Sequence, residues 1–264
     1  MDTVNLIYYS PTGTTRQVVK ETGQKLGLKL TSQYNITKLQ TEFRPEISDN
    51  SVSIIGVPVY GGRLPTPAVE RMHTFHSNHS PAVIIAVYGN RAYDDSLLEL
   101  KDIVHNCGFR IIAGAAFIGE HSFSSKDKPI ARGRPDEQDL IKCVDFGRMI
   151  KDKLVKTEDM NTISEPRIPG KHPYKERKQL PVTVFPETDN DTCNRCGKCI
   201  ATCPSNAITI NHSITTNGNL CTWCCACVRN CPNGARTFNN PTINTIQEKL
   251  FANCTIRKEP EFFL

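Results

Sequence analysis

A cysteine motif that occurs twice near the C-terminal end constrains this chain more than any other feature. Residues 193–204 read CNRCGKCIATCP, and residues 221–232 read CTWCCACVRNCP. Each of the four motif cysteines and the proline after them recurs after a shift of 28 residues, so the segment is an internal repeat. So many thiols in one short segment indicate metal ligation rather than packing in an apolar core.

The spacing within each motif is typical of ligands to a [4Fe–4S] cluster. C-x2-C-x2-C lets one tight loop direct three sulfurs at three corner irons, and the fourth cysteine, followed by proline, points away and ligates the other cluster. Structural zinc is the alternative, but it favours paired cysteines with a longer gap between the pairs. The ligands expected for the first cluster are Cys193, Cys196, Cys199 and Cys231, and those for the second are Cys221, Cys224, Cys227 and Cys203.

The other cysteines have simpler interpretations. Cys225 sits beside a ligand and breaks the spacing, so we interpret it as a spare thiol. Cys107, Cys143 and Cys254 fall in helical or tail segments, where inert buried thiols are expected in preference to redox-active ones. Trp223, inside the second motif, is expected to shield the cluster from water.

The first 155 residues alternate short apolar runs with amphipathic segments. The expected strands are 4–9, 30–39, 51–60, 82–90 and 110–119, and the expected helices are 14–26, 65–76, 94–108 and 136–154. This alternation predicts an α/β domain with a parallel sheet covered on both faces. Five strands in this length of chain favour the doubly wound order 2-1-3-4-5.

The composition changes after this domain. Prolines and charges predict an extended linker over 156–187, followed by a small α+β domain over 188–240. A tail over 241–264 contains one short helix and ends in two phenylalanines and a leucine. Because such side chains are costly to leave in water, we expect the tail to dock on another part of the protein.

A loop rich in hydroxyl groups follows the first strand and opens the first helix. The sequence YYSPTGTTRQ (8–17) also contains a glycine that lets a ligand approach the backbone. A helix N-terminus presents unpaired N–H groups to an anion, so the loop is a candidate phosphate site. Ordinary helix capping is the alternative. The candidate phosphate-binding residues are Ser10, Thr12, Gly13, Thr14 and Thr15.

Two further loops emerge at the same edge of the predicted sheet, where ligands bind in folds of this order. VPVYGGRLP (57–65) and VYGNRAYDD (87–95) both contain glycine and tyrosine. We expect the two tyrosines to bracket a planar ring and the Gly-Gly peptide to turn toward it; ordinary loops are the alternative. The candidate ring-binding residues are Val59, Tyr60, Gly61, Gly62, Gly89, Asn90 and Tyr93.

With its Ser10-x-Thr12-Gly13-x-Thr15 pattern, the first domain resembles a short-chain flavodoxin, and the cysteine repeat resembles a bacterial-type ferredoxin. Over nearly its full length the chain resembles the flavodoxin–ferredoxin fusion proteins of anaerobes, the flavodoxin-domain ferrodoxin family. The resemblance implies non-covalently bound FMN and two [4Fe–4S] clusters. It also implies a flavodoxin-like fold for the first domain.

These cofactors predict an electron-transfer protein that relays single electrons between the clusters and the FMN, with no catalytic residue of its own. The alternatives are an FMN-dependent reductase of a small molecule or quinone, and a redox-sensing binding module. We expect redox partner proteins, namely ferredoxin-like donors or acceptors. The sequence leaves the oligomeric state open, a homodimer included.

Charge and hydropathy argue against other classes of protein. The net charge of +5 is nearly cancelled by two clusters of about −2 each, so we expect no nucleic-acid partner. The basic run KHPYKERK (171–178) is interpreted as a solvated linker, and His73, His76 and His79 as solvated side chains. With neither a transmembrane run nor a secretory signal in the sequence, we expect no membrane partner, a cytoplasmic location and no structural disulfides.

Overall fold

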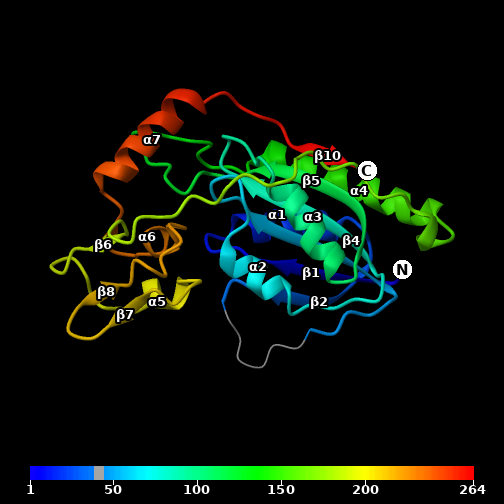
Figure 1. The fold of residues 1–264 in the computed structure, drawn as a ribbon, viewed down its shortest axis with the longest axis horizontal. Helices are drawn as coiled ribbons and strands as arrows, with labels where there is room; N and C mark the ends of the chain where they lie inside the picture. Colours follow the sequence, from blue (N-terminus) through cyan, green and yellow to red (C-terminus); the bar gives the residue numbers. More distant parts are fainter. Residues whose placement is uncertain (39–44) are drawn as a thin grey trace.

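The computed structural model describes residues 1–38 and 45–264. A large lobe, formed by the N-terminal part of the chain, is a sheet with helices on both faces (Figure 1). A small lobe, formed by the cysteine repeat, lies at one end of the large lobe, and the C-terminal tail returns from it to the edge of the sheet (Figure 1).

Five parallel strands of the large lobe follow the predicted doubly wound order. Neighbouring strands pair in parallel in the order β2-β1-β3-β4-β5, which confirms the fold predicted from the sequence. The predicted second strand extended to residue 39, which lies outside the described residues. The strands are β1 (Thr3–Tyr8), β2 (Lys29–Asn35), β3 (Ser51–Pro58), β4 (Pro81–Tyr88) and β5 (Arg110–Ile118).

Four helices cover the sheet, two on each face (Figure 1). They are α1 (Thr14–Gln24), α2 (Thr66–Met72), α3 (Ser96–Asn106) and α4 (Glu137–Lys156), and a 3₁₀ turn, η1 (Met160–Thr162), follows α4. Successive strand residues point to opposite faces, so Ile54 packs under α1 and α4 whereas Ile55 packs under α2 and α3. Within the described residues, no helix is both long and apolar enough to cross a membrane.

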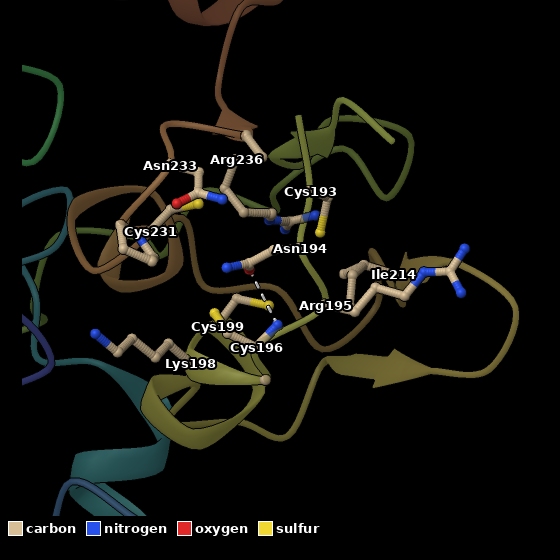
Figure 2. Close-up of a pocket in the computed structure, with 13 residues that line it drawn as sticks. Cys193, Asn194, Arg195, Cys196, Lys198, Cys199, Ile214, Cys231, Asn233 and Arg236 are labelled. Atoms are coloured by element: carbon tan, nitrogen blue, oxygen red, sulfur yellow. Dashed lines mark hydrogen bonds between the residues drawn. The ribbon is translucent and has the colours of Figure 1, made fainter. Parts of the chain in front are cut away.

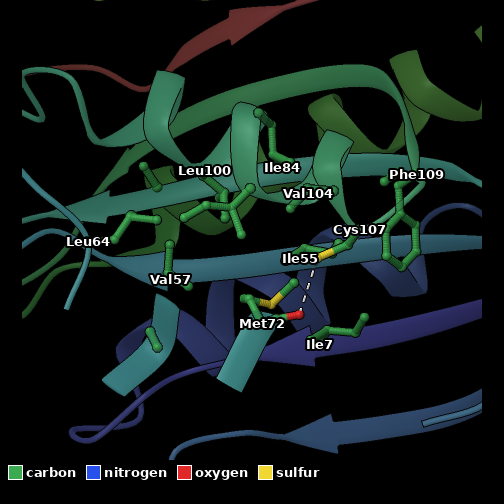
Figure 3. Packing of buried hydrophobic residues seen from close by; sticks show 14 of the residues in the cluster. Ile7, Ile55, Val57, Leu64, Met72, Ile84, Leu100, Val104, Cys107 and Phe109 are labelled. Atoms are coloured by element: carbon green, nitrogen blue, oxygen red, sulfur yellow. Dashed lines mark hydrogen bonds between the residues drawn. The ribbon is translucent and has the colours of Figure 1, made fainter. Parts of the chain in front are cut away.

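The core under α2 and α3 is closely packed around the central strands (Figure 3). Leu100 and Val104 of α3 and Met72 of α2 contribute to it, and the Cys107 thiol donates a hydrogen bond to the Met72 carbonyl at 3.3 Å. Cys143 is fully buried on the other face, where burial raises its thiol pKa to about 12. Both thiols are buried, in keeping with the inert role expected of them.

A sixth, antiparallel strand, which the sequence did not predict, joins the five predicted parallel strands. β10 (Glu261–Phe263) pairs antiparallel with β5, with Phe262 opposite Ala115. Phe262 enters the core under α1 and α4 and stacks on Phe146 with ring centroids 4.8 Å apart. Phe263 packs into the opposite core. The tail therefore closes the edge of the sheet with one aromatic ring on each face.

The small lobe contains short elements around the cysteine loops. β6 pairs antiparallel with β9, and β7 and β8 form a hairpin. Three of the motif cysteines pack with Ile208 and Ile214 in the lobe's core. The elements are β6 (Glu187–Thr188), α5 (Lys198–Thr202), β7 (Ile208–Ile210), β8 (Ile214–Thr216), α6 (Ala226–Arg229) and β9 (Arg236–Thr237), and α7 (Pro241–Asn253) follows them.

The linker between the lobes is fixed to α3 by its charges. Lys175 donates its backbone N–H to Asp95 at 2.7 Å and forms a 2.8 Å ion pair with Asp94, just before α3 begins. His172 contacts Asp102 of α3 at 2.8 Å. The basic run thus makes specific contacts in addition to meeting solvent.

Replacing Phe262 by Ala should lower the free energy of unfolding by about 3 kcal/mol, because the stacked ring leaves a cavity beside Phe146. Urea unfolding followed by circular dichroism measures the change. Leu264→Ala, at a side chain that is 51% exposed, is the control and should change stability by less than about 0.5 kcal/mol. Equal stabilities for Phe262→Ala and the unmodified protein would contradict the docking of the tail.

Candidate functional site

The four cysteines predicted to bind the first cluster line one cavity (Figure 2). The cavity has a volume of about 300 Å³, including its opening to solvent. Three of the thiols come from the loop before α5 and from α5 itself, and Cys231 comes from the second motif. The structure therefore brings together thiols that are as far as 38 positions apart in the sequence, from Cys193 to Cys231.

The four cysteines predicted to bind the second cluster line a second cavity of about 310 Å³. Cys203, contributed by the first motif, accepts a hydrogen bond from the backbone N–H of Ala207 at 3.3 Å. Thr222, Cys225 and Arg236 are also part of the wall. Each cavity thus contains three candidate ligand thiols of one motif and the last thiol of the other, with the spare Cys225 also in the second, and this is the exchange that the sequence predicts.

The two cysteine loops share one backbone conformation. Gly197, before α5, has a φ of 73°, and Cys225, at the equivalent position before α6, has a φ of 57°. Glycine adopts this left-handed region without steric cost, whereas a residue with a Cβ is strained there. The spare thiol therefore occupies a position where the first motif has glycine.

The arrangement of the thiols differs from that of a zinc site. A zinc ion needs its sulfur ligands about 2.3 Å from a single point. In the described part of the chain no three His, Cys, Asp or Glu side chains are placed in this way around a single metal ion. His73, His76 and His79 are exposed, in keeping with their interpretation as solvated side chains.

Burial opposes ionisation of the thiols in the second cavity. It raises the pKa of Cys221 and Cys227, and it raises the pKa of Cys224 to about 12. Thiolates at these positions need positive charge nearby, and coordinated iron supplies such charge. The donor set is therefore suited to a metal cluster and poorly suited to free thiolates.

The second cavity lies beside the end of β1 and the loop after β3. Tyr9 is fully buried there, and burial together with the nearby Cys224 raises the pKa of its hydroxyl. Burial raises the pKa of the Tyr60 hydroxyl as well, with further contributions from Cys224 and Tyr9. Tyr60 is a candidate ring-binding residue, so the second cysteine set is close enough to the predicted flavin site to affect its electrostatics.

Arg71 of α2 joins the two lobes at this point. Its guanidinium lies 5.8 Å from the centre of the Tyr9 ring and donates hydrogen bonds to the carbonyls of Ile36 at 2.9 Å and Pro204 at 2.6 Å. Pro204 directly follows the exchanged ligand Cys203. The sequence analysis assigned no role to Tyr9 or Arg71, although Tyr9 stands at the strand end where ligands bind in this fold.

The candidate phosphate loop has the backbone of an anion site. Gly13, with a φ of 88°, is the N-cap residue of α1 and has no side chain with which to cap that helix. The Ser10 hydroxyl accepts a hydrogen bond from the backbone N–H of Arg16 at 3.0 Å, and the Thr12 and Thr14 hydroxyls are 3.4 Å apart. A Cβ added at Gly13 would meet no atom within 4 Å, so the space beside the loop is open. These features fit a phosphate group.

The other residues of this loop are less accessible. Thr15 is buried, and its methyl group packs 3.1 Å from the position that a Cβ on Gly56 would occupy. The backbone N–H of Ser10 donates to the Thr37 hydroxyl at 2.8 Å, which holds the start of the loop in place. Whether Thr15 contacts a phosphate stays a prediction.

The loop after β3 forms a tight turn. Tyr60 and Arg63 exchange backbone hydrogen bonds of 2.9 and 3.2 Å around Gly61 and Gly62, which have φ values of 63° and 90°. A Cβ at Gly61 would meet no atom within 4 Å, whereas one at Gly62 would collide with Asp94. Val59, just before the turn, donates its backbone N–H to Val87 of β4 at 2.9 Å. Gly61 is thus the position of the turn where a planar ring could approach the backbone.

The loop after β4 is held by the C-terminal tail. The Asn90 amide donates to the carbonyls of Cys254 at 2.7 Å and Ile256 at 2.9 Å. The Tyr93 hydroxyl donates to Glu261 at 2.8 Å, and its ring packs against Tyr88 at 5.4 Å between centroids. Tyr93 packs against Tyr88, and Tyr60 is paired with Arg63 in the turn. The stacking of Tyr60 and Tyr93 on one planar ligand ring therefore stays a prediction.

His121 lies in the loop after β5, which the sequence analysis did not include in the site. Its ring packs so closely on Gly89 that a Cβ there would lie 2.4 Å from the ring. Burial, with help from the charges of Arg229 and Arg91, lowers the pKa of His121 to about 4. The imidazole ring of His121 is therefore neutral at pH 7. Its position leaves no room for a side chain at residue 89, which is glycine.

Comparison with known proteins finds the 4Fe-4S binding domain family over residues 185–208, which include the first motif. No curated protein matches the chain. Solved structures match part of the chain. A flavodoxin from the domain Archaea covers 58% of this chain and 99% of its own, at 11% identity and a TM-score of 0.42. Flavodoxin 1 from Bacillus cereus covers 57% and 98%, at 14% identity and a TM-score of 0.39.

Replacing Cys203 by Ala should impair the second cluster rather than the first, because this thiol lines the second cavity. EPR spectra of reduced protein, with iron analysis, measure which cluster remains. Cys203→Ala should keep the same signal as Cys224→Ala, and Cys231→Ala the same signal as Cys196→Ala. Cys225→Ala is the control and should keep both signals. A spectrum of Cys203→Ala that matches Cys196→Ala would refute the exchange of ligands.

Proposed function

We propose that this chain, which joins a flavodoxin-like sheet to a 4Fe-4S binding domain, is an electron-transfer protein that relays single electrons between two [4Fe–4S] clusters and one FMN. The observation that carries the proposal is the docking of the small lobe at the predicted flavin edge of the sheet, where Arg71 donates to the carbonyl of Pro204, next to Cys203, at 2.6 Å while its guanidinium lies 5.8 Å from the centre of the Tyr9 ring. The clusters would supply one-electron steps and the flavin one- or two-electron steps. The protein's own residues bind, shield and position these groups.

The sequence differences between the two cysteine motifs support a particular order in which electrons pass through the two clusters. Where the first motif has Arg195, Gly197 and Lys198, the second has Trp223, Cys225 and Ala226. The first set of cysteines is open to solvent, since its member Cys196 is exposed. In the second motif, by contrast, Ala226 is fully buried. We therefore infer that electrons pass between a partner protein and the first cluster, and from there through the second cluster to the flavin.

Direct contacts between the lobes favour an internal electron relay rather than two lobes that work independently. Lys38 donates to the carbonyl of Ile200 at 3.2 Å, next to ligand Cys199. Arg229 of α6 forms a 3.1 Å ion pair with Glu120, and donates to the carbonyl of His121 at 2.8 Å. These contacts fix the cysteine loops against the ligand-binding edge of the sheet. A fixed separation is what repeated internal electron transfer requires.

The large lobe contributes a site suited to FMN. The start of α1, with Gly13 at its N-cap, and the hydroxyls of Thr12 and Thr14 suit the phosphate, and the open side of Gly61 suits the ring. The position at the carboxyl edge of a doubly wound sheet is where such ligands bind. FMN is therefore favoured over a flavin without phosphate.

Loss of the second cluster should slow reduction of the flavin by about tenfold or more, because electrons would then cross from the first cluster directly. Anaerobic stopped-flow mixing with a reduced ferredoxin, read by flavin absorbance, measures this rate in the unmodified protein and in Cys224→Ala. Cys143→Ala, which removes a buried thiol far from both cavities, is the control and should keep the original rate.

Equal rates of flavin reduction in Cys224→Ala and the unmodified protein would contradict the relay. The same preparation also separates the proposal from its main alternative. Rapid turnover of a nicotinamide or a quinone by the isolated protein would identify a reductase with its own substrate instead of a carrier.

A further inference from the structure

Arg236 is a buried cation between the two cysteine cavities. It belongs to the wall of both, and only 3% of its surface is exposed. Figure 2 shows its side chain beside the first cavity, reaching inward from β9. A guanidinium keeps its charge in any protein environment, so burial cannot neutralise it.

Among the described residues, no anionic side chain contacts the Arg236 guanidinium. The guanidinium donates to the hydroxyls of Thr188 at 2.7 Å and Thr216 at 3.0 Å, and to the Cys227 sulfur at 3.6 Å. Its Nε has no hydrogen-bond partner among the described residues. No ion pair found between described residues includes Arg236. Burying such a charge is costly unless an anion compensates it.

The internal repeat shows that the fold does not require this charge. The residue equivalent to Arg236 in the first half of the repeat is Ile208, 28 positions earlier. Ile208 is 4% exposed and packs in the core of the small lobe. An aliphatic side chain is therefore accommodated at the equivalent position of the first repeat. The fold alone does not explain the guanidinium at Arg236.

The anions that would compensate Arg236 are the clusters themselves. A [4Fe–4S] cluster with four thiolates carries about −2 and gains one more negative charge on reduction. Arg236 lines the first cavity together with Cys199, and it lines the second cavity together with Cys227, to whose sulfur it donates at 3.6 Å. Arg236 thus lies beside both ligand sets.

We propose that Arg236 sets the reduction potentials of the two clusters and favours the second, whose ligand Cys227 it contacts. This inference rests on the proposed function. Its positive charge stabilises the added electron, so transfer from the first cluster to the second is downhill. One cluster loses an electron, the other gains it, and no proton moves because Arg236 stays protonated.

The test uses complete protein with its clusters, prepared without oxygen, in a redox titration followed by EPR. Arg236→Ile installs the residue that the first repeat already has. The second cluster should become at least tenfold harder to reduce, which is a shift of about 59 mV to lower potential. The first cluster should shift less, and the signal kept by Cys203→Ala identifies it.

Two further variants make the result decisive. Arg236→Lys keeps the charge and should keep both potentials near their original values. Lys178→Gln removes a positive charge from the exposed linker, where solvent screens it, and should shift neither potential.

Unchanged potentials in Arg236→Ile would overturn the proposal, as would an equally large shift in Arg236→Lys. If Arg236→Ile assembles no clusters, the charge-keeping Arg236→Lys must assemble both, and its failure would also overturn the proposal. Unmodified protein without cluster signals would instead contradict the proposed function. The two failures are thus distinguishable.

Discussion

The carboxyl edge of the parallel sheet determines where the rest of the molecule lies. Loops after β1, β3 and β4 emerge there because all five strands run in the same direction. The small lobe docks against the same edge, where Arg71 donates to Pro204 while its guanidinium lies near the Tyr9 ring. The tail then crosses back and fixes the third loop through Asn90. One topological rule therefore brings the candidate phosphate loop, the candidate ring-binding turn and a cysteine set to the same edge.

The two halves of the small lobe share one backbone arrangement but carry chemically different side chains. Both halves use a left-handed residue before a short helix, yet Gly197 becomes Cys225 and Ile208 becomes Arg236. These changes place one buried cation between the cavities. Sequence duplication supplies two similar cysteine sites, and the substitutions between the halves make their surroundings different.

Periodicity predicted the parts of the fold that local sequence encodes. The five parallel strands, the four main helices and the convergence of the cysteines followed from apolar patterns and from motif spacing. β10 was missed because three residues carry no period and their partner in β5 lies more than 140 positions away. The roles of Asn90 and Tyr93 are also set by distant contacts, with Cys254 and Glu261. Arg236 could have been noticed by comparing the repeats position by position, since it replaces an isoleucine.

The most direct measurement of the central claim is Mössbauer spectroscopy with iron, acid-labile sulfide, zinc and flavin analysis of protein purified without oxygen. The account predicts iron and sulfide in equal amounts, sufficient for two [4Fe–4S] clusters per chain, together with one FMN. Stoichiometric zinc in place of iron, or iron sufficient for only one cluster, would contradict it.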